Sequence, residues 1–106
     1  MKRRKDLIDL LVYTLVQMIP VGRVATYSSI ARVLRVHPRR VAIALKKNKN
    51  PIVIPCHRVV MSDLRIGGYS LGVEMKKRLL ELEGVEIVGD RIRSREYVVK
   101  LDEELL

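Results

Sequence analysis

The chain has 106 residues, of which 48% are hydrophobic, and its 21 Lys and Arg residues against 12 Asp and Glu residues give a formal net charge of +9. This length fits one domain with its own core, and the excess of cations indicates a polyanionic partner, with nucleic acid as the leading candidate. The single cysteine excludes an internal disulfide and a metal site built from several cysteines, and no apolar run approaches a membrane span. We therefore expect one soluble, cytoplasmic domain over residues 1–106.

The first half of the chain predicts three helices. Apolar side chains recur at helical spacing before Pro20 and indicate an amphipathic helix. Its apolar residues are Leu7, Ile8, Leu11, Leu15, Val16 and Ile19. After a turn with a short extended piece at residues 21–26, a second helix spans residues 27 to about 34. Pro38, which suits the first helical position, begins a third that ends at about Lys47. The last two helices predict a helix-turn-helix at about residues 27–47, whose second helix normally enters a groove of DNA.

The third predicted helix has an apolar face and a cationic face. Its spacing directs Val41, Ala44 and Leu45 inward. The opposite face consists of Arg39, Ala42, Ile43 and Lys46. Seven cations, with no acid between them, surround this helix: Arg32, Arg35, Arg39, Arg40, Lys46, Lys47 and Lys49. An ion-rich surface that serves stability alone is the other explanation of the charge, but this local concentration favours a nucleic-acid interface.

The only cysteine, Cys56, lies in a largely apolar segment, residues 51–60, and is followed directly by His57. A lone intracellular cysteine usually behaves as a small buried hydrophobe. A nucleophilic thiol instead needs a base or a positive neighbour, because a pKa of about 8.5 leaves it mostly protonated at neutral pH. Adjacency in the sequence does not make His57 that base, so the residues alone leave both interpretations open. From the residues alone, Asn48 is a turn residue, because residues 47–51 are rich in turn formers, and Glu83 is a surface acid at a helix end.

The second half of the chain predicts less regular structure. The glycine-rich loop at residues 66–72 lacks the spacing of a phosphate-binding motif. A helix follows over residues 73–83, with apolar Met75, Leu79, Leu80 and Leu82, and Gly84 ends it. Residues 85–93 alternate around a Gly-Asp turn and predict a small hairpin, and a tail spans about residues 94–106. The expected fold is mainly α with a small β element, a winged helix-turn-helix-like single domain.

Several short motifs in order carry a family resemblance. They are Ile19-Pro20-x-Gly22-Arg23-Val24-Ala25-Thr26-Tyr27, then Pro38-Arg39-x-Val41, Asn48 eight residues before Ile54-Pro55-Cys56-His57-Arg58-Val59-Val60, then Gly68-Tyr69-Ser70 and Glu83-Gly84. Together they resemble the O6-alkylguanine-DNA alkyltransferases over about residues 7–88. The Pro-Cys-His-Arg-Val string with these flanks is highly specific.

The resemblance implies a role for each residue of the thiol centre. Cys56 would accept the alkyl group, and His57 would take the thiol proton through a water. Glu83 would orient His57, which reproduces the nucleophile, base and orienter logic of a catalytic triad. Asn48 would hold the turn that presents the active-site segment.

The resemblance also implies how the chain would reach its target. An alkyl group on guanine O6 lies within the stacked duplex, so the nucleotide must be extruded. Arg39 would fill the vacated stack, and Tyr27 would help to rotate the phosphate of the extruded nucleotide. Without the resemblance, the charge of Arg39 suggests a phosphate contact, and Tyr27 would be a tyrosine at the rim of the core. Ala42 would allow close approach in the minor groove, with Lys46 on the same helix face. The pocket residues would be Tyr69, Ser70, as donor to guanine O6, and Leu71, where the family typically has glycine.

The predicted function is therefore a single-use DNA repair protein that transfers the alkyl group of O6-alkylguanine in double-stranded DNA to Cys56. We expect a monomer that needs no metal or other cofactor. The family usually carries an additional amino-terminal domain, and single-domain relatives are often alkyltransferase-like proteins that bind the lesion without repairing it and have tryptophan at the cysteine position. This chain has Cys56 and no tryptophan. The alternative function is a non-catalytic protein of this kind, which binds the lesion and recruits another repair pathway. A helix-turn-helix transcription regulator is a third possibility, but it leaves Cys56, His57, Glu83 and the glycine-rich loop unexplained.

Overall fold

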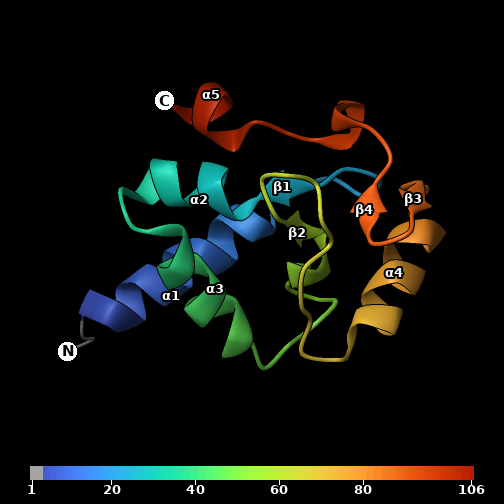
Figure 1. The fold of residues 1–106 in the computed structure, drawn as a ribbon. Coiled ribbons are helices and arrows are strands. Elements are labelled where there is room, and N and C mark those ends of the chain that lie inside the picture. Colours follow the sequence, from blue (N-terminus) through green and yellow to red (C-terminus); the bar gives the residue numbers. More distant parts are fainter. Residues whose placement is uncertain (1–3) are drawn as a thin grey trace.

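The computed structural model describes residues 4–106, and helices dominate this part of the chain (Figure 1). The α-helices are α1 (Arg4–Val16), α2 (Tyr27–Leu34), α3 (Pro38–Lys46), α4 (Val73–Leu82) and α5 (Leu101–Leu105). The strands are β1 (Ala25–Thr26), β2 (Val59–Val60), β3 (Ile87–Val88) and β4 (Arg91–Ile92), and two 3-10 turns, η1 (Cys56–Arg58) and η2 (Arg95–Tyr97), complete the order. The predicted fold class, mainly helical with a small β element, is confirmed.

Helix α1 packs against α2 and α3, but its buried side differs from the predicted stripe. The helix ends at Val16 and does not reach Ile19. Ile19 lies in the turns after the helix and is buried there. Val12 and Val16 are fully buried, whereas Leu7 is 52% and Leu11 41% exposed. At about 100° of rotation per residue, a core-facing line through Val12 and Val16 turns Leu7 toward solvent. The prediction for these two leucines was wrong because the helix is apolar on more than one side.

Helices α2 and α3 form the predicted helix-turn-helix. Thr26 caps α2, since its hydroxyl accepts the backbone N–H of Ser29 over 3.1 Å. His37 caps α3 in the same way, with Nδ1 accepting the N–H of Arg39 over 3.0 Å, and Pro38 takes the first helical position. The inward residues Val41, Ala44 and Leu45 are all buried, as predicted.

Short strands bring distant segments beside the cysteine. Strand β1 pairs in parallel with β2, so the start of the helix-turn-helix lies next to the residues that follow Cys56. The C-terminal segment extends this arrangement, because Val24 bonds to both Tyr97 and Val99 through backbone groups at 2.9 and 2.7 Å. Helix α5 then packs on α2, above the rest of the molecule in Figure 1. The predicted hairpin is present as β3 and β4, paired antiparallel.

Two apolar clusters hold these elements together. The larger one joins α1, α2 and α3 with Cys56 and Val59, and the smaller one lies under α4 and the hairpin. Helix α4 departs from its predicted apolar face, since Met75 is 45% and Leu82 80% exposed while Lys76 and Leu80 are fully buried. In the described residues, no helix is long and apolar enough to cross a membrane.

Candidate active site and nucleic-acid interface

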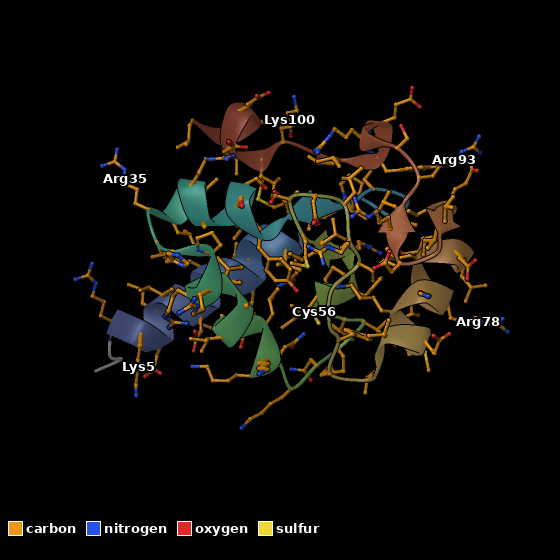
Figure 2. The ribbon with its side chains drawn as sticks, viewed as in Figure 1. Lys5, Arg35, Cys56, Arg78, Arg93 and Lys100 are labelled. Carbon is orange, nitrogen blue, oxygen red and sulfur yellow. The ribbon has the colours of Figure 1, made fainter. Side chains whose placement is uncertain are left out.

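Cys56 begins the 3-10 turn η1, directly after Pro55, and only 5% of it is exposed. Figure 2 shows its side chain inside the molecule, whereas those of Arg35, Arg78 and Lys100 project outward. Its Sγ atom accepts a hydrogen bond from the side-chain amide of Asn48 over 3.2 Å. A donor to sulfur stabilises the negative charge that develops there when the sulfur reacts, so this contact supports nucleophilic character.

Asn48 joins the end of α3 to the cysteine segment. Besides its bond to Cys56, its Nδ2 donates to the carbonyl oxygen of Ile54 over 3.1 Å, and its Oδ1 accepts the N–H of Asn50 over 2.9 Å. Asn48 is only 7% exposed, so these bonds are shielded from water. One side chain therefore sets both ends of the turn between the helix-turn-helix and Cys56.

A cavity of about 380 Å³ opens onto Cys56. Most of the residues predicted for the pocket and the interface line it. The lining consists of Tyr27, Ala42, Leu45, Lys46, Cys56, Gly68, Tyr69 and Ser70. Leu71 is not among them, and it is 48% exposed. The cavity thus lies between the outer face of α3 and the glycine-rich loop, which places the thiol at a surface formed by the helix-turn-helix.

His57, the next residue after Cys56, is in contact with Glu83. His57 is 1% exposed, and its Nε2 lies 3.1 Å from Oε2 of Glu83. Arg58 binds the same carboxylate through two nitrogens, at 2.9 and 2.7 Å. The carboxylate that the resemblance assigns to His57 is therefore shared with an arginine, a contact that the sequence motif did not indicate.

The pKa values of this group show how the charges are balanced. Burial lowers the pKa of His57 most strongly, the bond to Glu83 and its charge act in the opposite direction, and the net pKa is lowered. Burial works to raise the pKa of Glu83, but the hydrogen bonds from Arg58 and His57 outweigh it and hold that pKa below its usual value. At neutral pH the arrangement is an ionised carboxylate beside a neutral imidazole, which is the state in which histidine can act as a base.

Lys76 is a buried cation near the site that sequence reasoning missed. Its side chain is fully buried, and its Nζ donates to the carbonyl oxygens of Val59, Ile66 and Gly68 at 2.8, 2.6 and 3.2 Å. Burial lowers the pKa of Lys76 to about 8, and the charge of Cys56 opposes that shift. Lys76 thus ties the glycine-rich loop to β2. Its place on the same helix stripe as Leu80 was the available signal.

The cationic face of α3 is smaller than the sequence suggested. Asp9, on α1, lies 2.8 Å from Arg40 and 2.6 Å from Lys47. Burial works to raise the pKa of Asp9, but the hydrogen bonds from Lys47 and Arg40 hold it below its usual value. Two of the predicted interface cations therefore have a structural partner, and Arg32 has another in Asp102 at 3.1 Å.

Arg39 and Lys46 are exposed at opposite ends of the same face of α3, with Ala42 between them. A second groove, of about 520 Å³, adjoins the first and is lined by both Arg39 and Tyr27. Tyr27, Ala42 and Gly68 border both hollows. The structure therefore brings the predicted DNA-contacting residues to one surface around the entrance to the Cys56 cavity.

The chain is similar to known proteins over most of its length. Residues 8–85 match the family model described as 6-O-methylguanine DNA methyltransferase, DNA binding domain. A methylated-DNA–protein-cysteine methyltransferase of Methanothermobacter thermautotrophicus is 51% identical over 78 residues, which are 74% of this chain and 44% of that protein. The chain spans about half the length of the curated relatives it matches.

Two solved structures have folds similar to that of this chain. The crystal structure of O6-methylguanine-DNA methyltransferase from Pyrococcus kodakaraensis superposes with a TM-score of 0.69 at 49% identity, over 73% of this chain and 46% of that one. Atl1 of S. pombe, in complex with damaged DNA containing O6-carboxymethylguanine, superposes with a TM-score of 0.81 at 34% identity, over 94% of this chain and 99% of that one. The family model covers every residue from Tyr27 to Glu83 discussed above, and the chain belongs to the family of 6-O-methylguanine DNA methyltransferase DNA-binding domains.

Proposed function

We propose that this chain binds double-stranded DNA containing O6-alkylguanine, rotates the damaged nucleotide out of the stack and transfers its alkyl group to Cys56. The observation that carries the proposal is the position of Cys56. A buried thiol with an amide donor on its sulfur faces a cavity that opens between a cationic helix face and a glycine-rich loop. A purely structural cysteine needs neither the cavity nor a neighbouring buried histidine that contacts Glu83.

The chemistry is a displacement at carbon. The thiol proton passes to His57 through a bridging water, and Glu83 stabilises the imidazolium that forms. The Cys56 sulfur attacks the alkyl carbon, the carbon–O6 bond breaks, and the guanine leaves with the bonding electron pair and takes up a proton. A thioether at Cys56 remains. Because a thioether carbon is a poor target for water at neutral pH, each chain acts once and the reaction needs no cofactor.

The DNA contacts follow from the surface around the cavity. Arg39 lies outside the Cys56 cavity, in the adjoining groove, which suits a side chain that replaces the extruded nucleotide in the stack. Tyr27 borders both hollows and would guide the phosphate of the rotating nucleotide. Ala42 permits close approach of α3 to the minor groove, where sequence is read poorly, as a scanner for damage requires. We infer that Ser70 donates to guanine O6, that Tyr69 forms the pocket wall, with Leu71 at its edge, and that a cytoplasmic monomer acts.

A second candidate function is lesion binding without transfer. It is favoured by the match to Atl1, which extends over nearly the whole of both chains. Cys56 and its contacts argue for transfer, so the two functions differ in one measurable outcome.

That outcome is the mass of the intact protein after incubation with a duplex that contains one O6-methylguanine. We expect the mass to rise by one methyl group in place of one proton, with fragmentation locating it on Cys56 and the reaction stopping at one equivalent per chain. Cys56→Ser should bind the same duplex without gaining mass. If the unmodified protein binds the lesion and its mass does not change, the binding function replaces the transfer function.

A further inference from the structure

Arg58 uses its whole guanidinium group inside the site. Nε and one terminal nitrogen hold the two oxygens of Glu83 at 2.9 and 2.7 Å, and the other terminal nitrogen donates to the carbonyl oxygen of Ile19 at 2.8 Å. Only 12% of the Arg58 side chain is exposed. Ile19 is buried in the turn after α1, so this third bond anchors the guanidinium to a fixed part of the core.

The anchored guanidinium determines what His57 can do. Both carboxylate oxygens of Glu83 are bound by Arg58, so the carboxylate cannot turn toward solvent. Its Oε2 therefore stays beside Nε2 of His57. A neutral imidazole facing a carboxylate carries its proton on the facing nitrogen. That leaves Nδ1 as the acceptor, and within the described residues this buried Nδ1 has no hydrogen-bond partner.

We propose that Arg58 is a positioning residue for the transfer reaction, which through Glu83 holds His57 in the tautomer that offers Nδ1 to the thiol proton. The inference rests on the proposed function of Cys56. Lysine could not replace arginine here, because only the planar fork of a guanidinium binds both carboxylate oxygens and a third acceptor at once.

The charges around His57 support this role. Burial lowers the pKa of His57, Glu83 raises it, and Arg58 and Lys76 lower it again. The other groups beside the imidazole are Cys56, its neighbour in the chain, and Tyr69, whose ring is edge-on at 6.3 Å between centroids. Without Arg58, the charge of Glu83 would be opposed by Lys76 alone. The pKa of His57 would then rise, and more of the imidazole would be protonated and unable to accept the thiol proton at neutral pH.

The test is a titration of the imidazole nitrogens by NMR in the absence of DNA. The chain has two histidines, and exposed His37 gives an internal reference. In the unmodified protein we expect His57 as the neutral tautomer with its proton on Nε2 at neutral pH. Arg58→Gln should raise the midpoint of His57. Arg65→Gln, which removes an exposed arginine bound to Asp63, is the matched control and should leave that midpoint unchanged.

A folded Arg58→Gln protein with the midpoint and tautomer of the unmodified protein would overturn the proposal. If Arg58→Gln does not fold, the unmodified protein decides, since a proton on Nδ1 or a charged imidazole at neutral pH contradicts the assignment. The titration involves no alkyl transfer, so its failure leaves the proposed function intact. Conversely, a protein that gains no methyl group can still show the Arg58 effect. Where transfer does occur, the acid limb of its pH profile should move upward with the His57 midpoint in Arg58→Gln.

Discussion

The amide nitrogen of Asn48 lies 3.2 Å from the sulfur of Cys56 and donates to it, while the same side chain braces the turn from α3 through Ile54 and Asn50. A residue just beyond the end of α3 is therefore in direct contact with the sulfur of Cys56. Any change at Asn48 acts on the stability of the turn and on the state of the thiol together.

Asn48→Ala should lower both stability and thiol reactivity. Loss of these three hydrogen bonds leaves the Asn50 N–H without its partner and the Ile54 carbonyl with the N–H of Cys56 alone, which costs about 1–3 kcal/mol of the free energy of unfolding. The sulfur of Cys56 also loses its donor, so its reaction with iodoacetamide should be slower. Urea unfolding and the rate of that reaction at neutral pH measure the two effects. Asn50→Ala keeps the backbone N–H that Asn48 binds, and equal losses in both variants would refute the assignment.

Lys76 should give the unfolding free energy a distinctive pH dependence. Its pKa is about 8 in the folded state against 10.5 ordinarily, so between these values the unfolded chain binds more protons and stability rises with pH. The contribution is on the order of 1.4 kcal/mol per pH unit within that window. Lys76→Met should remove this rise, while Lys77→Met, which replaces the less buried neighbour, should retain it. Parallel stability curves for the unmodified protein and Lys76→Met would show that Lys76 titrates normally.

Local pattern predicted the helix-turn-helix well. The spacing of Val41, Ala44 and Leu45 identified the buried face of α3, and Pro38 identified its start, because both depend on the helix itself. Local pattern was not enough to predict the group of residues around the thiol. Cys56 and His57 are adjacent in the chain, but only the family motifs indicated Glu83, which arrives from the end of α4.

The contacts that sequence reasoning missed join different elements of the fold. Asp9 meets Arg40 and Lys47 only because α1 packs on α3, and Lys76 is buried only because three carbonyl groups of β2 and the glycine-rich loop converge on it. Leu7 and Leu11 were predicted to be buried only from the helical spacing of the apolar residues. They are exposed because α1 has more apolar positions than its buried side can hold. A pattern shows which faces can be buried, and packing selects among them.

Asp9→Asn should destabilise the protein at neutral pH and not in acid. The pKa of Asp9 is lowered in the folded state, so its contribution is present above the ordinary carboxyl pKa and is lost as the pH falls through the folded-state value. We expect a loss of about 1.5–3 kcal/mol at neutral pH, as for hydrogen bonds to charged groups. Thermal or urea unfolding at several pH values would measure it. Asp6→Asn, on the exposed side of α1, is the control, and a deficit that persists undiminished in strong acid would argue against the ion pairs as its cause.

Arg39 and Lys46 occupy the same face of α3. The proposed function assigns Arg39 to the vacated stack, and we expect the exposed Lys46 to contact a phosphate. If Arg39 enters the base stack, Arg39→Ala should reduce extrusion of the damaged nucleotide and leave the salt dependence of binding nearly unchanged. If Lys46 neutralises a phosphate, Lys46→Ala should lower the slope of log affinity against log salt by roughly 0.9 and leave extrusion intact. A fluorescent base analogue beside the O6-methylguanine reports unstacking, and titrations at several salt concentrations give the slope. Arg39→Ala could instead show normal extrusion together with a slope lowered by roughly 0.9. That result would make Arg39 a phosphate contact, and another side chain would then fill the vacated stack.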